Sequence, residues 1–144
     1  MFVEIAELLL GTAVEAVENP PARHLVLPGR ENAWDCEMVY VQMAGAQAVT
    51  RDNACPSFLD VMFQVGLLRC VTVQDRQGRA PTAEQITSDG LIHLDDAEAL
   101  FKALACLKIE HPAVVRNSVG SSNHLGPTGA LVGVEWGVTV RLTV

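Results

Sequence analysis

The side chains best suited to hold a metal ion in this chain are its four cysteines and four histidines. They are Cys36, Cys55, Cys70, Cys106, His24, His93, His111 and His124. Structural zinc sites place such ligands in pairs at short, regular spacings. No two cysteines are separated by the two residues of a zinc knuckle or a redox motif. The spacing therefore predicts no metal site, and Cys70 and Cys106 are better interpreted as small buried hydrophobes.

Carboxylates that could bind magnesium or act as acid and base occur in two places. Asp95, Asp96 and Glu98 form a cluster, but they fall in a predicted helix, where such a charged group normally faces solvent. Glu135 and Arg141 lie in the last predicted strand. Both fall on its polar side, which indicates a surface that faces solvent or a neighbouring subunit. Neither group predicts a catalytic site.

Phosphate binding and nucleophilic catalysis also lack their usual sequence context. Gly126, Gly129 and Gly133 could suggest a phosphate loop, but no lysine follows them as in the Walker pattern. A strand, and not a helix, is predicted after these glycines. Ser57 does not lie in a nucleophile elbow. We therefore expect a protein that is not an enzyme and that has no catalytic residue, cofactor or metal.

The composition fits one soluble domain over residues 1–144. Hydrophobic residues make up 49% of the chain, the formal net charge is −7, and the isoelectric point is near 4.9. An acidic chain is poorly suited to grip a phosphate backbone, which requires clustered Lys and Arg. The acidic start lacks the basic region of a secretory signal, and no apolar run reaches the ~20 residues of a membrane span. We expect a reducing compartment, free thiols and no membrane contact.

Apolar residues recur at helical spacing in two segments, residues 2–17 and residues 82–107. Prolines end the first helix. Thr82, with Gln85 three residues later, forms the sequence pattern of a capping box at the start of the second. Gly90 is the weakest position of this helix, because glycine costs ~1 kcal/mol relative to alanine. The predicted inward face of the second helix comprises Ala83, Ile86, Gly90, Leu94, Ala97, Phe101, Leu104 and Lys108.

Three segments ahead of the chain's final strand have different strand-like patterns. Residues 25–27 form a short apolar run, and residues 36–43 are apolar on both faces, which is typical of a central strand. Residues 59–73 share one apolar face that only Arg69 interrupts, and Gly66 suggests a bend or bulge. Connections are predicted at residues 45–56 and 117–130, the second of them glycine-rich and mobile.

The last segment, Val132 to Val144, alternates between apolar and small or polar residues without interruption. At ~3.3 Å per residue such a strand is ~43 Å long, whereas a compact domain of this size has a radius of gyration of only ~14–15 Å. The strand therefore spans the whole domain, bends, or reaches past it to a neighbouring subunit. Helices on a mixed or antiparallel sheet of long strands predict an α+β two-layer sandwich, with an N-terminal helix and one long helix.

Three pieces of sequence, taken in order, carry a resemblance to a known family. The first is Leu-Pro-Gly followed by Ala-Trp-Asp-Cys-Glu, the second is Gly-Leu-Leu-Arg-Cys-Val, and the third is Leu-Gly-Pro-Thr-Gly ahead of the closing strand. They occupy residues 27–29, 33–37, 66–71 and 125–129, with Gly133 and Val138–Leu142 following. With these pieces, residues 20–144 resemble the tail terminator proteins of siphophages that infect actinobacteria, a head-tail joining family.

The resemblance implies an α/β fold, in which helices pack on a sheet, and a structural role in the virion. Six copies would form a ring at the head-proximal end of the tail tube. The ring would stop tube polymerisation and then dock onto the head-completion, or stopper, protein. The implied place is the head-tail junction of the virion, after assembly in the cytoplasm of the bacterial host. DNA would pass through the lumen without specific binding, and the family has no catalytic residues to carry over.

The composition agrees with a ring in one respect. A closed ring has heterologous interfaces, so each subunit must present two different adhesive faces, and a mean hydropathy of +0.24 leaves apolar surface for them. Contacts with other subunits or partners are predicted in the 117–130 segment and on the polar faces of the long strands. These residues are Arg69, Ser121, Asn123, Leu125, Pro127, Glu135 and Arg141.

Two kinds of alternative function stay open from the sequence. The first is another head-tail connector, although stoppers are usually small β-barrels and adaptors mainly helical, unlike a long helix between two long strands. The second is a small ligand-binding or regulatory α+β domain, or a small enzyme that uses a thiol. A concave pocket that holds a Cys or His with a shifted pKa would favour the second kind.

Overall fold

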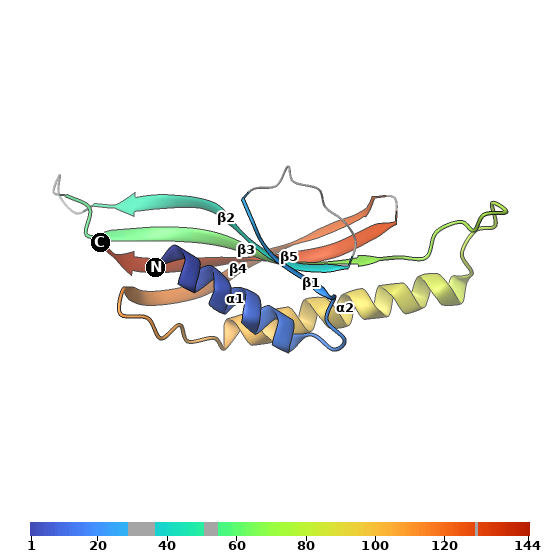
Figure 1. Ribbon diagram of the computed structural model, residues 1–144, viewed down its shortest axis with the longest axis horizontal. Coiled ribbons are helices and arrows are strands. Elements are labelled where there is room, and N and C mark those ends of the chain that lie inside the picture. Colours follow the sequence, from blue (N-terminus) through green and yellow to red (C-terminus); the bar gives the residue numbers. More distant parts are fainter. Residues whose placement is uncertain (29–36, 51–54, 129) are drawn as a thin grey trace.

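The computed structural model describes residues 1–28, 37–50, 55–128 and 130–144, with only the backbone described at Pro127 and Thr128. Figure 1 shows an elongated molecule in which long strands lie over two helices. Along the chain the elements are α1 (Phe2–Ala16), β1 (Arg23–Leu27), β2 (Met38–Val49), β3 (Phe58–Cys70), α2 (Ala83–Ala105), β4 (Val114–Thr128) and β5 (Leu131–Thr143). Cys36 and Gly129 fall outside the described residues.

The sheet is mixed and has the strand order β1-β2-β3-β5-β4. β1 pairs in parallel with β2, whereas the other neighbouring strands are antiparallel. Both helices contribute to one hydrophobic core, so they cover the same face of the sheet (Figure 1). The predicted α+β fold, with an N-terminal helix and one long helix on a mixed sheet, is confirmed.

The core follows directly from the periodicities of the sequence. Residues four apart on α1 and α2 meet alternate residues of the three central strands. The fully buried members include Leu9 and Ala13 of α1, Leu100 of α2, Val39 and Val41 of β2, Val65 of β3, and Val134, Val140 and Leu142 of β5. Each large apolar side chain buried in this way contributes about 1.5–3 kcal/mol of hydrophobic stabilisation, which holds the two layers together.

Helix α2 begins where its sequence predicts. The Thr82 side chain accepts a hydrogen bond from the backbone N–H of Gln85, and the Gln85 side chain accepts one from the backbone of Thr82. The predicted inward face is wrong for most of its residues. Of that face α2 buries only Ala97 and Leu104, together with Asp96 and Leu100, which were not predicted. The other predicted residues are exposed: Ala83, Ile86, Gly90, Leu94, Phe101 and Lys108.

The predicted mobile connection at residues 117–130 is wrong, because most of it belongs to the long strand β4. Its glycines and serines do not favour a strand locally, but β5 provides a complete hydrogen-bonding partner beside them. The small residues are accommodated by register shifts, one of them between Val119 and Ser122. Residues 45–49, also predicted as a connection, extend β2 and pair with β3 after a shift between Met43 and Gly45.

The closing strand β5 lies inside the sheet. It pairs with β3 in continuous register from Leu131 to Thr143, and β4 occupies its other edge. Its length is therefore matched by neighbouring strands of the same chain. The possibility that β5 itself pairs with another subunit is wrong, since the strands at the two ends of the described sheet are β1 and β4.

The cysteines are only partly free thiols. Cys55 and Cys106 are free and exposed, whereas Cys70 is disulfide-bonded. The expectation of free thiols is therefore wrong for Cys70, and the expected burial of Cys70 and Cys106 is wrong as well, because both residues are exposed. Within the described residues, no helix is long and apolar enough to cross a membrane.

Candidate functional site

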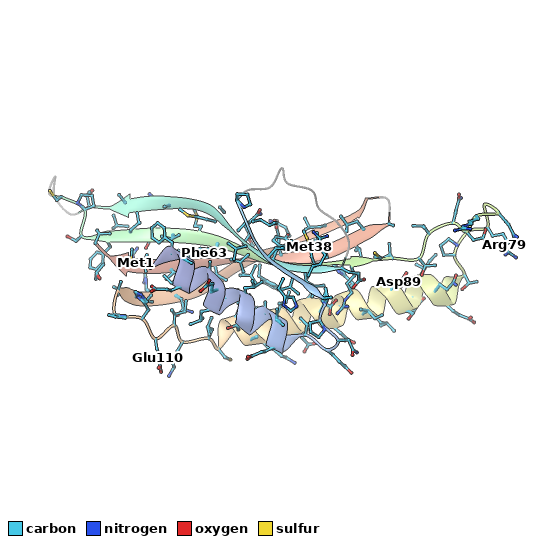
Figure 2. All side chains as sticks on the ribbon, in the orientation of Figure 1. Met1, Met38, Phe63, Arg79, Asp89 and Glu110 are labelled. Atoms are coloured by element: carbon cyan, nitrogen blue, oxygen red, sulfur yellow. The ribbon has the colours of Figure 1, made fainter. Side chains whose placement is uncertain are left out.

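The described parts of the three sequence pieces that carry the family resemblance contact one another at one end of the sheet, while residues 29, 33–36 and 129 of these pieces lie outside the described residues. A small apolar cluster forms around Met38 and includes one leucine from each piece: Leu27, Leu68 and Leu125. Figure 2 labels Met38 where β1 crosses the longer strands. Backbone contacts add to this convergence. The N–H of Val71 donates to the carbonyl oxygen of Ala130 at 2.8 Å. We call this region the motif end of the sheet.

Gly66, the first residue of the second piece, has a packing role there. It pairs with Tyr40 on one side and with Glu135 on the other. A Cβ atom at Gly66 would lie 2.3 Å from the Tyr40 ring. The ring therefore passes over the glycine, and the Tyr40 hydroxyl donates a hydrogen bond of 2.8 Å to the Glu135 carboxylate. Gly66 produces no bulge, contrary to the prediction, since the pairing is regular on both of its sides.

Glu135 is fully buried, so its interpretation as a residue that faces solvent or another subunit is wrong. One carboxylate oxygen accepts from Tyr40, and the other accepts from the Asn123 side chain at 3.3 Å. Such hydrogen bonds offset part of the cost of burying a charged group. The arrangement ties β2, β4 and β5 together at the motif end, and it leaves Asn123, predicted as a contact, with an internal partner.

Arg69 also has its partners within the chain. Its guanidinium donates to both carboxylate oxygens of Asp96, at 2.6 and 3.0 Å. It donates as well to the backbone carbonyls of Glu18 and Asn19. Asp96 is only 5% exposed, so the predicted solvated face is wrong for it, whereas Asp95 is exposed. The sequence signal was Arg69 itself, a lone charge on an apolar strand face, which requires a buried partner.

Arg141 lies on the outer face of the sheet, as its place in the alternation predicts. It donates two hydrogen bonds to Asp60 on the neighbouring strand, at 2.7 and 2.6 Å. These hydrogen bonds from Arg141 lower the pKa of the Asp60 carboxyl. Asp60 faces Arg141 directly across β3 and β5, a pairing that the sequence alone does not fix because it depends on register.

The other predicted contacts lie along β4. Ser121 is exposed, whereas Leu125 is half-buried and packs against the cluster at the motif end. The Pro127 side chain lies outside the described residues. The structure therefore brings Asn123 and Glu135 together, while Arg69, Arg141 and Ser121 lie in separate places.

A groove of about 440 Å³ beside the first half of α2 was not predicted. Its walls are mainly apolar and come from α2, from the extended segment before it and from the start of β5. They comprise Val71, Thr72, Pro81, Ile86, Asp89, Gly90, His93 and Val132. Figure 2 labels Asp89 on this part of α2. We call it the α2 groove.

The polar groups of the α2 groove have partners in the chain. The Asp89 carboxylate accepts a hydrogen bond of 2.8 Å from the backbone N–H of Thr72. Nε2 of His93 lies 2.9 Å from Nδ1 of His124 on β4. Burial is the main cause that lowers the pKa of His93, and the nearby charge of His124 lowers this pKa further. With Asp89 and His93 partnered and most of the lining apolar, the groove is suited to apolar side chains or an apolar ligand.

The described residues offer no assembled catalytic centre. No group of three or more His, Cys, Asp or Glu side chains within the described ranges could hold a metal ion. The two neighbouring histidines, His93 and His124, lack a third ligand there. Comparison of the chain with models of known protein families and with curated proteins finds no match. The site must therefore be interpreted from its own geometry.

Proposed function

We propose that this chain is a structural virion protein of a siphophage. In this proposal six copies form a ring that caps the head-proximal end of the tail tube, stops tube polymerisation and joins the tail to the head. Its partners are other copies of itself, the tail tube protein and the head-completion protein. DNA passes through the lumen without specific binding, and no catalysis is involved.

The contact between the described parts of the three resembling pieces is the observation that carries the proposal. They are separated by tens of residues in the sequence, yet Leu27, Leu68 and Leu125 share one cluster. Gly66 of the second piece and Gly133, which follows the third, both lie in tight contacts there: a Cβ atom would lie 2.3 Å from the Tyr40 ring at Gly66 and 2.4 Å from the carbonyl oxygen of Leu67 at Gly133. A resemblance spread over unconnected surface loops would have been weaker support than one concentrated in a single packed end.

Unpaired apolar surface gives further support. Ile86, Leu91 and Leu94 of α2 are each more than half exposed. Apolar patches on a protein surface commonly mark sites of association. A subunit of a ring requires such surface for contacts with its neighbours, which agrees with the proposed function.

Tube assembly in vitro provides the test. The tail tube protein encoded in the same genome is polymerised with and without this protein, and tube lengths are measured by electron microscopy. We expect added protein to shorten the tubes and to lie at one end of each. Heat-unfolded protein at the same concentration serves as the control. Tubes that grow to full length with bare ends in the presence of folded protein would contradict the proposal.

The α2 groove favours one alternative, a small ligand-binding domain. It is concave, apolar, and bordered by His93, whose pKa is lowered by burial. Such a combination is a common feature of ligand sites. Titration with an apolar fluorescent dye distinguishes the two functions. Stoichiometric binding to an isolated monomer would favour a ligand-binding domain, whereas an assembled ring should bind little dye, because its apolar surface is covered.

A further inference from the structure

The second half of β2 is an unpaired edge of the sheet. β1 pairs with β2 only from Met38 to Gln42, and burial ends at the same point, since residues 43–49 are exposed or half-exposed. Figure 1 shows β2 continuing past β1 toward the end of the molecule where both termini lie. Among the described residues, the backbone of residues 43–49 forms hydrogen bonds with β3 alone. We call residues 43–49 the β2 edge.

The β2 edge lacks the features that normally protect an exposed strand. Alternate residues of an edge strand direct their N–H and C=O groups away from the sheet. Natural proteins protect such groups from pairing with charged residues, proline or bulges. The β2 edge reads Met-Ala-Gly-Ala-Gln-Ala-Val, without a charge or a proline, and it is regular from Gly45 to Val49. The partner that satisfies this backbone is another extended strand.

The sheet has a second unpaired edge on β4. β5 pairs with one side of β4, and within the described ranges no other backbone group forms a hydrogen bond with the backbone of residues 115–119. Val115 is 52% exposed, and Arg116 and Ser118 are exposed as well. We call residues 115–119 the β4 edge. The chain therefore has two different strand edges that can each accept a strand.

The two edges match in direction and in position along the strands. The strand pairs β2–β3, β3–β5 and β5–β4 are all antiparallel, so β2 and β4 run in opposite directions. A second copy related by rotation about an axis along the strands would therefore bring its β2 antiparallel to the β4 of the first copy. Register connects Gln47 through Asp60 and Arg141 to Arg116. The two edges thus lie at the same height along the strands.

We propose that the β2 edge of one copy pairs antiparallel with the β4 edge of the next copy, so that the sheets of neighbouring subunits become continuous. The proposal rests on the self-association in the proposed function and names the two surfaces that carry it. Two different edges make a heterologous contact, and repeated heterologous contacts close into a ring when the rotation allows it.

Charge favours this pairing over a symmetric one. Arg116 lies in register with Arg141, and both are attracted to the same carboxylate, Asp60. Pairing of two β4 edges would bring a second Arg116 close to the first, and like charges on opposed strands are destabilising. Head-to-tail pairing places Arg116 beside the uncharged Gln47 of the next copy, whose neighbour on β3 is Asp60. Pairing of two β2 edges would leave the β4 edge unsatisfied.

Disulfide cross-linking tests the pairing directly. Cys55→Ser and Cys106→Ser first remove the exposed free thiols. Gln47→Cys then labels the β2 edge and Arg116→Cys labels the β4 edge. Within one chain these positions are three strand spacings apart, or ~14 Å, whereas the Cα atoms of a disulfide lie within ~7 Å of each other. Any disulfide between the two new cysteines must therefore join two copies.

The variant with both new cysteines should form a covalent ladder under mild oxidation, up to six times the 15.5 kDa of the chain. Each single-cysteine variant should stay uncross-linked alone, and the two refolded together should give dimers and nothing larger. Dimers of Gln47→Cys alone or of Arg116→Cys alone would reveal symmetric pairing and overturn the inference.

Two further positions complete the cross-linking test. Ser118→Cys, two residues along on the same side of β4, replaces Arg116→Cys to cover a shifted register. If Gln47→Cys cross-links to neither position, the inference is overturned. Gln74→Cys, at an exposed residue outside both edges, is the matched control, and cross-linking of this control to the same extent as Arg116→Cys would also overturn the inference.

Charge at Gln47 gives a second measurement that requires no cross-link. Gln47→Glu should lower the dissociation constant of self-association about threefold, and Gln47→Lys should raise it about threefold, because each new charge lies beside Arg116 of the next copy. Light scattering over a dilution series measures both, and the same changes at Gln74 should have no effect. Shifts of the same sign at Gln47 would contradict the inference.

The outcome is separable from that of the proposed function. Rings that form without these cross-links would overturn the edge pairing and leave tube capping intact. Cross-linked rings that fail to shorten the tail tubes would overturn the proposed function alone.

Discussion

Gly66 shows how a single missing side chain can organise a sheet. The Tyr40 ring occupies the space over this glycine on its way to Glu135. We predict that Gly66→Ala destabilises the protein by about 1–3 kcal/mol, the usual cost of overpacking. Gly90→Ala is the matched control, because nothing lies within 4 Å of a Cβ atom there and alanine gains ~1 kcal/mol in a helix. Urea denaturation should show a lower free energy of unfolding for Gly66→Ala and a higher one for Gly90→Ala. Equal changes in the two variants would contradict the packing role of Gly66.

The Arg69–Asp96 ion pair offers a second test at the scale of single residues. Asp96→Ala leaves the Arg69 guanidinium, whose side chain is only 16% exposed, without its carboxylate. We predict a loss of about 2–4 kcal/mol in unfolding free energy, somewhat below the cost for a completely buried pair. Asp95→Ala, at the exposed neighbour, should change it by less than ~0.5 kcal/mol. Equal losses of unfolding free energy in the two variants would contradict a stabilising role of the Arg69–Asp96 ion pair between α2 and β3.

Sequence reasoning at this scale finds the residues that break a pattern but not their partners. Arg69 stood out as a charge on an apolar strand face, yet Asp96 could be assigned to it only once the helix was placed against the sheet. Glu135 followed the polar phase of its strand perfectly and is nevertheless buried. The alternation reports which face a residue occupies, whereas burial depends on what covers that face.

The contact between α2 and β4 should respond to pH. Burial and the charge of His124 lower the pKa of His93 in the folded protein, so the unfolded chain binds this proton more tightly. Stability from this source is complete above the ordinary histidine pKa of about 6.5 and falls as the pH decreases through it. We predict a lower unfolding midpoint at pH 5.5 than at pH 7.5. His93→Gln should reduce the difference in unfolding midpoint between the two pH values. An unchanged difference would contradict the role of His93.

At the scale of elements, strong periodicity was a reliable guide and local composition was not. The two helices, the capping box at Thr82 and the strand after residue 131 all follow from the sequence. β4 does not, because its glycines and serines indicate a loop and only the edge of β5 makes them a strand. The length of β5 was predicted correctly, and of the alternatives that the sequence left open only pairing with a neighbouring subunit is wrong, since β3 and β4 pair with this strand within the chain.

At the scale of the whole molecule, apolar surface is concentrated where the chain lacks a partner of its own. Ile86, Leu91 and Leu94 of α2 are each more than half exposed, and Figure 2 labels Asp89 on this part of the helix. Because β5 is internal to the sheet, the exposed apolar side chains of α2, and not β5, are available for contacts in a ring.

The most direct test of the central claim is electron microscopy of the purified protein at micromolar concentration. We expect closed rings whose class averages have six-fold symmetry and a central lumen wide enough for a DNA duplex. Uniform monomers, or open filaments that never close, would contradict it.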